Sequence, residues 1–179
     1  FQNFTYFLNN PVNGDQVEQE GRRWTSGGHV KHRRLNRIFN RSIESAIGIS
    51  LRNDSIGTVG LYNTAQRRRT NTIRKDVIGE TTVSFFGQAE IEWARKLRMT
   101  VGVRSDLYRY DVTALRPLNT GVGTTGIVSP KVTAVIGPWG GSEFYLNYGT
   151  GFHSNDARGA TTTVDPISET VVTKDDPLV

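Results

Sequence analysis

Residues 81–93, TTVSFFGQAEIEW, alternate two kinds of side chain along their whole length. Odd-numbered positions, from Val83 to Trp93, are mostly apolar or small, whereas even-numbered positions are polar apart from Phe86. Successive side chains of a β-strand point to opposite faces, so this period of two predicts a long strand with one apolar and one polar face.

The same period recurs elsewhere in the chain. Clear repeats lie at 43–51, 97–107 and 144–152, and weaker ones at 3–9, 23–32 and 127–137. We therefore expect about seven strands, no helical stretch and an all-β fold. Three of these strands exceed the roughly 5–6 residues typical of globular sheets, and they match the roughly 9–11 residues that cross a bilayer at a tilt.

The expected connections also favour a membrane barrel. Residues 94–96 and 138–141 are read as tight turns and 33–41 as a moderately short connection. The polar segments 10–20, 53–80, 112–126 and 154 to the end are read as long loops that alternate with the short ones. Short turns at one end and long loops at the other are typical of antiparallel outer-membrane barrels.

Aromatic residues gather near both expected ends of the strands. Phe39, Trp93 and Trp139 lie near the short turns, and a second group lies near the long loops: Tyr6, Trp24, Tyr108, Tyr110 and Phe152. Two aromatic belts are typical of a barrel that spans a membrane. The alternative is that these rings close the two ends of a soluble sandwich core.

The amino-acid composition is compatible with a membrane barrel. The chain has no cysteine, which excludes a disulfide framework and thiolate metal sites, and no run of roughly 18 apolar residues that would form a membrane helix. Transmembrane strands carry their signal in the period and not in the mean hydropathy. The net charge of +5 favours an anionic partner or surface. Since the chain lacks an initial Met, we expect a piece of a larger gene product.

Several motifs that suggest other functions are weak. GVGTTG at 121–126 has the glycine spacing of a dinucleotide site, but a strand-like IVSPKV follows where a helix is required, so we expect a flexible loop tip. His153, Ser154 and Asp156 are too close in an extended chain to converge as a hydrolytic triad, and we expect no enzyme.

Metal and nucleic-acid sites are also disfavoured. His29 and His32 have opposite parity on a strand, so we expect no metal site and no cofactor. A calcium site at Asn13, Asp15 and Glu18 is the alternative to a polar, turn-rich loop.

The basic clusters at 29–41 and 66–75 fall at opposite ends of the expected strands, which argues against nucleic acid. Solvated charge near a membrane surface is the simpler interpretation. Capture of an anionic ligand by Arg67, Arg68 and Arg69 is the alternative.

The segment NYGTGFHSNDARG at 147–159 resembles the barrel signature of TonB-dependent outer-membrane receptors. FTYFLNNPVNGDQVEQ, VSPKVTAVIGPWGGSEFYLNYG and the closing TTTVDP and DPLV resemble the same family. The resemblance implies a 22-stranded antiparallel transmembrane barrel around a plug domain, of which residues 1–179 would be a part of about seven strands, without the plug. It also implies localisation in the outer membrane of a Gram-negative bacterium.

The resemblance further implies import of a scarce small ligand, such as a ferric siderophore, driven by the TonB complex through an N-terminal region. Lipid and lipopolysaccharide would surround the barrel. A passive porin-like channel and a soluble β-rich module for an anionic polymer remain alternatives. The candidate ligand contacts lie in the expected extracellular loops: Arg67, Arg68, Arg69, Tyr108, Tyr110, His153, Asp156 and Arg158.

Two further expectations concern side-chain direction. Asn155, Asp156 and Arg158 are expected to order the loop by hydrogen bonds, with direct ligand contact by His153 and Arg158 as the alternative. Phe152 is expected on the lipid side. Polar side chains of the central strands are expected in the lumen, facing water or the plug: Gln88, Glu90, Glu92, Arg104 and Asp106.

Overall fold

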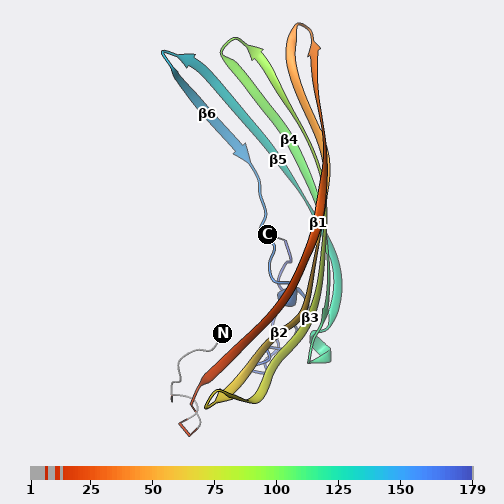
Figure 1. The fold of residues 1–179 in the computed structure, drawn as a ribbon, viewed down its shortest axis with the longest axis vertical. Helices are drawn as coiled ribbons and strands as arrows, with labels where there is room; N and C mark the ends of the chain where they lie inside the picture. Colours follow the sequence, from red (N-terminus) through yellow and green to blue (C-terminus); the bar gives the residue numbers. More distant parts are fainter. Residues whose placement is uncertain (1–6, 8–10, 13, 179) are drawn as a thin grey trace.

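The computed structural model of the protein describes residues 7, 11, 12 and 14–178. In this part of the chain six strands form one antiparallel sheet in sequential order. The strands are β1 (Gln16–Ile38), β2 (Arg41–Ala65), β3 (Arg68–Ala94), β4 (Leu97–Thr113), β5 (Gly121–Trp139) and β6 (Ser142–Gly149). The sheet is strongly curved, like a piece of a barrel wall (Figure 1). The all-β, antiparallel prediction is confirmed, and the expected strand at 3–9 lies largely outside the described residues.

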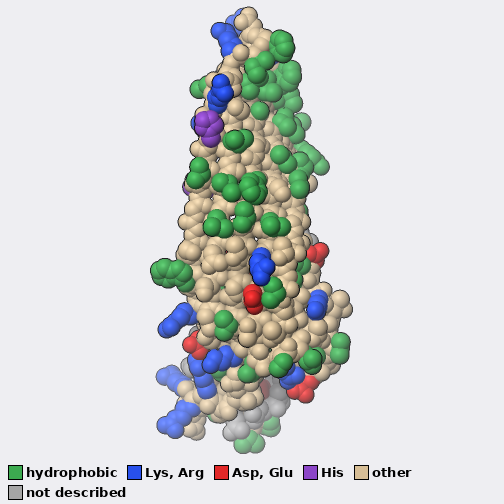
Figure 2. Space-filling view, turned by 90° about the vertical axis from the view of Figure 1, so that its right-hand side faces the viewer, with side chains coloured by type: hydrophobic (Ala, Val, Ile, Leu, Met, Phe, Trp, Pro, Cys, Tyr) green, Lys and Arg blue, Asp and Glu red, His purple; other side chains and the backbone are tan. Residues whose placement is uncertain are grey.

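The register places the apolar positions on one face. Ile47 pairs with Gly87, Gly87 with Val103, and Val103 with Pro130, so this row of outward positions crosses four strands. Ile47 and Val103 are 62% and 51% exposed, although they are apolar. Figure 2 shows hydrophobic side chains over the upper part of the convex face, with most charged side chains near the lower end. The predicted division into an apolar and a polar face is therefore confirmed.

The long loop predicted at 53–80 is wrong, and the one predicted at 112–126 is shortened to residues 114–120, whereas the described segment 154–178 contains no long strand. β2 and β3 continue through 53–80 and meet at a hairpin turn in which Gln66 and Arg67 have positive φ. The turn at Phe39 and Asn40 is no tighter, so short and long connections do not alternate strictly. The period of two is lost in 53–80 because register shifts interrupt the pairing of β2 with β3 while backbone hydrogen bonds still join the strands.

The flexible loop tip expected at 121–126 is also wrong. These residues form the start of β5, where Gly123 pairs with Tyr110. A Cβ atom on Gly123 would lie 2.2 Å from the Tyr110 hydroxyl oxygen. Here the glycine makes room for a tyrosine of the neighbouring strand and has no role in a phosphate-binding turn.

One of the two aromatic belts is incomplete. Phe39, Trp93 and Trp139 are exposed at the end that carries the tight turns, as expected. At the other end Trp24 is exposed on the convex face, but Tyr108 is only 4% exposed and lines the concave face. Phe152, which was expected on the apolar outer face, lines the concave side, because the chain leaves β6 at Gly149 and the strand parity ends there. Tyr6 lies outside the described residues.

The segment after β6 folds back against the concave face. The segment contains a five-residue helix, α1 (Ala157–Thr161), which was not predicted from the sequence. After this helix the segment is hydrogen-bonded to the short helix η1 (Pro117–Asn119) of the β4–β5 connection, because the Thr163 N–H donates to Asn119. Helix α1 lies beside the lower part of the sheet (Figure 1). Its Ala157 is fully buried against Ile56, Ile78 and Val112, and these residues form a small core. No helix among the described residues is long and apolar enough to cross a membrane.

Candidate functional site

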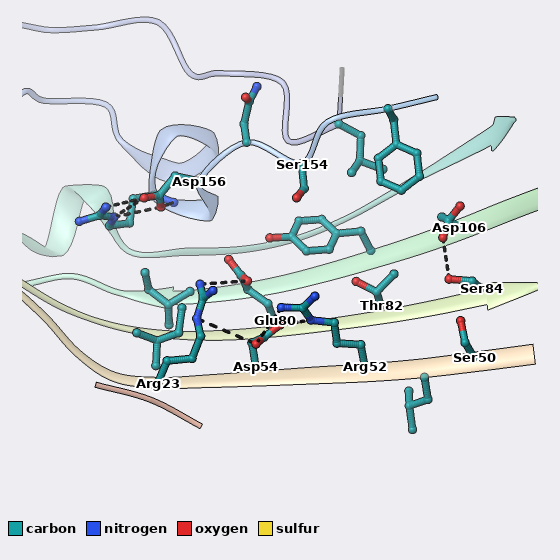
Figure 3. A pocket seen from close by; sticks show the side chains of 18 of the residues that line it. Arg23, Ser50, Arg52, Asp54, Glu80, Thr82, Ser84, Asp106, Ser154 and Asp156 are labelled. Carbon is teal, nitrogen blue, oxygen red and sulfur yellow. Dashed lines mark hydrogen bonds and ion pairs between the residues drawn. The ribbon is translucent and has the colours of Figure 1, made fainter. Parts of the chain in front are cut away.

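A cavity of about 820 Å³ lies between the concave face of the sheet and the segment 152–158 (Figure 3). Strands β1 to β4 supply its floor, and Phe152, Ser154, Asn155, Asp156, Arg158 and Leu178 supply the opposite side. Its lining includes five arginines and four carboxylates: Arg22, Arg23, Arg52, Arg104, Arg158, Asp54, Glu80, Asp106 and Asp156. The cavity is thus polar and charged, with basic groups in slight excess.

Two arginine–aspartate pairs with the same spacing organise the floor. Arg52 Nε lies 2.7 Å from Asp54 Oδ2, and Arg104 Nη2 lies 2.8 Å from Asp106 Oδ1. Residues two apart on a strand share a face, so each pair forms along its own strand. The Asp54 and Asp106 carboxylates are 6% and 1% exposed, whereas the Arg52 and Arg104 side chains are 61% and 50% exposed. The buried carboxylates therefore anchor the guanidinium groups, which remain accessible from the cavity.

Hydroxyl groups on neighbouring strands donate further hydrogen bonds to the carboxylates of both pairs. Ser84 Oγ donates to Asp106 Oδ1 at 2.6 Å, and Thr25 Oγ1 donates to Asp54 Oδ1. Arg23 lies 3.9 Å from Asp54 and 4.0 Å from Glu80, and it points toward both of them in Figure 3. A charged network thus crosses β1, β2 and β3, and its exposed donors are well suited to hold an anion with directional hydrogen bonds.

The opposite side of the cavity is ordered by Asp156 and Arg158. Asp156 is the N-cap of α1 and accepts from the Arg158 backbone N–H at 2.9 Å, and its carboxylate also forms an ion pair with the Arg158 guanidinium. Burial tends to raise the pKa of Asp156, but the hydrogen bonds and charge of Arg158 outweigh burial and lower that pKa below its ordinary value. Asp156 stays ionised and fixes the start of the helix.

Three of the predicted ligand contacts are brought together in the cavity: Tyr108, Asp156 and Arg158. Tyr110 packs beside them, with its ring centroid 5.8 Å from that of Tyr108. His153 is exposed, and it is absent from the cavity lining although both its neighbours belong to it. The hydrogen bonds of Asn155, Asp156 and Arg158 agree with the expectation that these residues order the loop.

The three consecutive arginines lie elsewhere. Arg67 is at the β2–β3 hairpin tip and Arg68 begins β3, and neither belongs to the cavity lining. Arg69 forms ion pairs with Glu18 and Glu20, and its guanidinium carbon is 3.8 Å from the centroid of the Tyr62 ring. Arg69 therefore joins three strands at the hairpin end, and its charge is matched by carboxylates of the chain.

Among the charged residues of the cavity, sequence reasoning missed five: Arg22, Arg23, Arg52, Asp54 and Glu80. The spacing Arg-x-Asp was the available signal, and it occurs at 52–54, 74–76, 104–106 and 109–111. At the first three of these places the structure shows an ion pair with a carboxylate that is at most 6% exposed. The prediction that Arg104 and Asp106 face the lumen side agrees with this arrangement.

The described residues contain no group of three or more His, Asp or Glu side chains that could hold a metal ion. Glu18, which the alternative calcium site required, lies in β1 and pairs with Arg69. Asn13, the first residue of that site, lies outside the described part. His29 and His32 pair with Ser50 and Ile47, so they point to opposite faces, as predicted.

Residues 1–175 match the family described as TonB dependent receptor-like, beta-barrel. The chain belongs to this family. No curated protein matches it closely enough to serve as a relative. Among solved structures it is similar to "Crystal structure of ferric citrate transporter FecA in the unliganded form", with a TM-score of 0.65 and 14% identity over 76% of this chain and 21% of that chain. At this identity the likeness shows the fold alone. The receptor barrel segment spans about a fifth of the length of that structure.

Proposed function

We propose that this chain forms part of the wall of an outer-membrane receptor that binds a small ligand and imports it with energy from the TonB complex. The observation that carries the proposal is the division of one curved sheet into an apolar convex face and a concave face with a charged cavity. An apolar outer face suits lipid, and a polar inner face suits a water-filled lumen. Membership of the receptor barrel family supports the same interpretation.

The orientation follows from the two ends of the sheet. The turns at 39–40, 95–96 and 140–141 lie at one end, which would face the periplasm, where barrel turns are short. The β2–β3 hairpin, the β4–β5 connection and the segment after β6 lie at the other end, which would face the outside (Figure 1). The cavity would then open toward incoming ligand.

The proposed ligand is a small anionic metal chelate such as a ferric siderophore or a ferric carboxylate complex. Arg23, Arg52 and Arg104 present side chains that are 52%, 61% and 50% exposed in the cavity. Their partner carboxylates are largely buried against the sheet, so the accessible surface is richer in donors than the residue count suggests. Hydrogen bonds from charged donors are about twice as strong as neutral ones and suit carboxylate or hydroxamate oxygens.

The test is uptake by cells that carry the full-length receptor. Cells receive radioactive iron as ferric citrate or as ferric siderophores, with and without a functional TonB complex. We expect saturable uptake that is lost without TonB. A receptor with Arg52→Gln and Arg104→Gln should bind the imported chelate at least tenfold more weakly, since each charged hydrogen bond contributes about 1.5–3 kcal/mol.

Arg98→Gln is the matched control. Arg98 also lies on the concave side but pairs with Glu143 toward the tight-turn end, outside the cavity. The affinity of the Arg98→Gln receptor for the imported chelate should stay within twofold of that of the wild type. Uptake that persists without TonB would instead support a passive channel, and recovery of the receptor in the soluble fraction would support a soluble binding module.

A further inference from the structure

The convex face carries an apolar groove of about 520 Å³ across β1 to β4. Its outward-facing lining comes from two adjacent rows of the sheet: Val30, Ile49, Phe85 and Ser105 in one row, and His32, Ile47, Gly87 and Val103 in the next. This groove lies on the face opposite the charged cavity, so it belongs to no part of the proposed ligand site.

The hollow arises where small residues follow one another on the central strands. Gly87 contributes no side chain, and the nearest atom to a Cβ built there is Ile47 Cγ2 at 3.9 Å. In the next row toward the tight turns, the neighbouring positions are Ser45 and Ala89, which are also small. Small side chains therefore border the groove on the side of the tight turns.

A basic side chain lies one row beyond the groove, toward the tight-turn end. Arg34 pairs with Ser45, two residues beyond the pair of His32 and Ile47, so it lies on the same face about 7 Å farther along the strand. Its neighbour Arg33 points to the concave side and pairs with Glu44 at 2.9 Å. Arg34 is exposed and has no carboxylate partner in the part of the chain that the structure describes.

An unpaired arginine on a lipid-facing surface is destabilising unless it reaches a polar group, and most so near the bilayer midplane. Near the tight-turn end the nearest such group is a lipid phosphate. Further basic groups lie closer to the tight turns than Arg34 does: the Arg41 guanidinium lies 5.2 Å from the Trp93 ring centroid, and Lys96 Nζ lies 5.3 Å from that of Trp139. Basic residues beside interfacial tryptophans suit an anionic head-group layer.

We propose that this groove is a binding site for one anionic glycerophospholipid of the periplasmic leaflet. An acyl chain would lie over Gly87 between Ile47 and Val103, and its phosphate would accept hydrogen bonds from Arg34, with His32 between the two. The inference rests on the proposed function, because it requires the convex face to lie in a membrane. It adds a lipid ligand that the import activity does not need.

The test is native mass spectrometry of the full-length receptor, extracted from outer membranes, stripped of lipid in detergent and titrated with phosphatidylglycerol. Wild-type receptor should keep one phosphatidylglycerol at higher occupancy than phosphatidylcholine. Arg34→Gln should lower that occupancy about fivefold, the effect expected for one basic contact to an anionic head group. Gly87→Leu fills the hollow and should lower binding of both lipids.

Two control variants keep the test specific. Arg33→Gln removes the adjacent arginine on the other face, and Gly28→Leu adds a side chain on the convex face outside the groove, where nothing lies within 4 Å of the new Cβ. Both should bind phosphatidylglycerol as the wild type does.

Three outcomes would overturn the lipid site. Equal binding by Arg34→Gln and wild type is one, and absence of any preference between the two lipids is another. Stronger retention of lipid A would assign the groove to lipopolysaccharide. All three leave the receptor proposal intact, because they are measured on receptor already folded in the outer membrane. Failure to find the receptor in that membrane would instead contradict the proposed function itself.

Discussion

The side chain of Asn119 holds the backbone of Val164 at both of its polar groups. Nδ2 donates to the Val164 carbonyl at 2.8 Å, and Oδ1 accepts from the Val164 N–H at 3.0 Å and from the Thr163 N–H at 3.0 Å. Asn119 ends η1 and is only 5% exposed, so these bonds join the β4–β5 connection to the segment after β6. The side-chain amide of Asn119 thus makes backbone hydrogen bonds of the kind that a neighbouring strand would make with that segment.

Asn119→Ala should loosen the segment after β6 without disturbing the barrel wall. It removes the hydrogen-bond partner of the Val164 carbonyl and of the Thr163 and Val164 N–H groups, which costs about 1–3 kcal/mol for each group that water does not reach. Hydrogen exchange of the full-length receptor should show faster exchange at 157–172. Asn147→Ala is the control, because Asn147 is exposed and bonds only to Thr133 among the described side chains. Equal exchange in both variants would contradict the role of Asn119 in holding this segment.

The two faces of the sheet should respond differently to charge. Val101 is 46% exposed on the convex face, whereas Gln88 points to the concave face. Val101→Arg should lower the free energy of unfolding in lipid vesicles by about 2–4 kcal/mol if Val101 lies near the midplane. Gln88→Arg should change it little. Urea titration of both variants measures this, and equal tolerance would rule out a lipid-facing convex surface.

Gly48 and Phe86 should be coupled in stability. They pair across β2 and β3, and a Cβ on Gly48 would come within 2.4 Å of Phe86 Cζ, because the ring covers the glycine. Gly48→Val should destabilise the receptor by about 1–3 kcal/mol through overpacking.

The double variant with Phe86→Leu should recover much of that loss, and a double-mutant cycle in unfolding free energy measures the coupling. Gly28→Val serves as a control, since its new Cβ has nothing within 4 Å. Simple addition of the two single effects would argue against the contact.

Acid should release the turn that follows α1. Asp165 accepts from the backbone N–H groups of Ser168 and Ile167, at 2.6 and 2.8 Å, and these bonds lower its pKa below the ordinary value. A carboxylate with a lowered folded-state pKa stabilises the fold fully above its unfolded pKa of about 3.9 and loses that effect as pH falls through the folded pKa.

Hydrogen exchange at 165–170 should therefore quicken between neutral pH and about pH 3, after correction for the intrinsic pH dependence of exchange. In the Asp165→Asn variant the corrected rates should be nearly independent of pH. The same corrected pH response in both proteins would exclude Asp165 as its source.

The period of two predicted the central strands well because one of their faces is apolar. In 81–93 and 97–107 each outward position is apolar or small and each inward position is mostly polar, so the sequence carries the pairing register. The rule failed at 53–80 for a physical reason. There polar residues lie on both faces, since Asp54, Asp76 and Tyr62 are buried on one face while other polar residues are exposed. Bulges also shift the alternation of the side chains between the two faces.

The site was predicted only in part. The motif around Asp156 and Arg158 identified one side of the cavity, but the floor comes from residues 23, 52, 54 and 80, which are far apart in sequence. Their convergence depends on the strand register, which no local pattern in 53–80 reveals. Arg69 was misleading for the opposite reason: consecutive arginines suggest free positive charge, yet Glu18 and Glu20 reach Arg69 from another strand.

The β2–β3 hairpin is much longer than a membrane requires. The 27 residues of β3 extend about 90 Å at 3.3 Å per residue, whereas a tilted strand needs about 9–11 residues to cross the hydrocarbon. In the proposed orientation the turn at Gln66 and Arg67 would stand well clear of the cell surface and outside the cavity. An epitope tag inserted at that turn should be readable by antibody on living cells while ligand uptake continues.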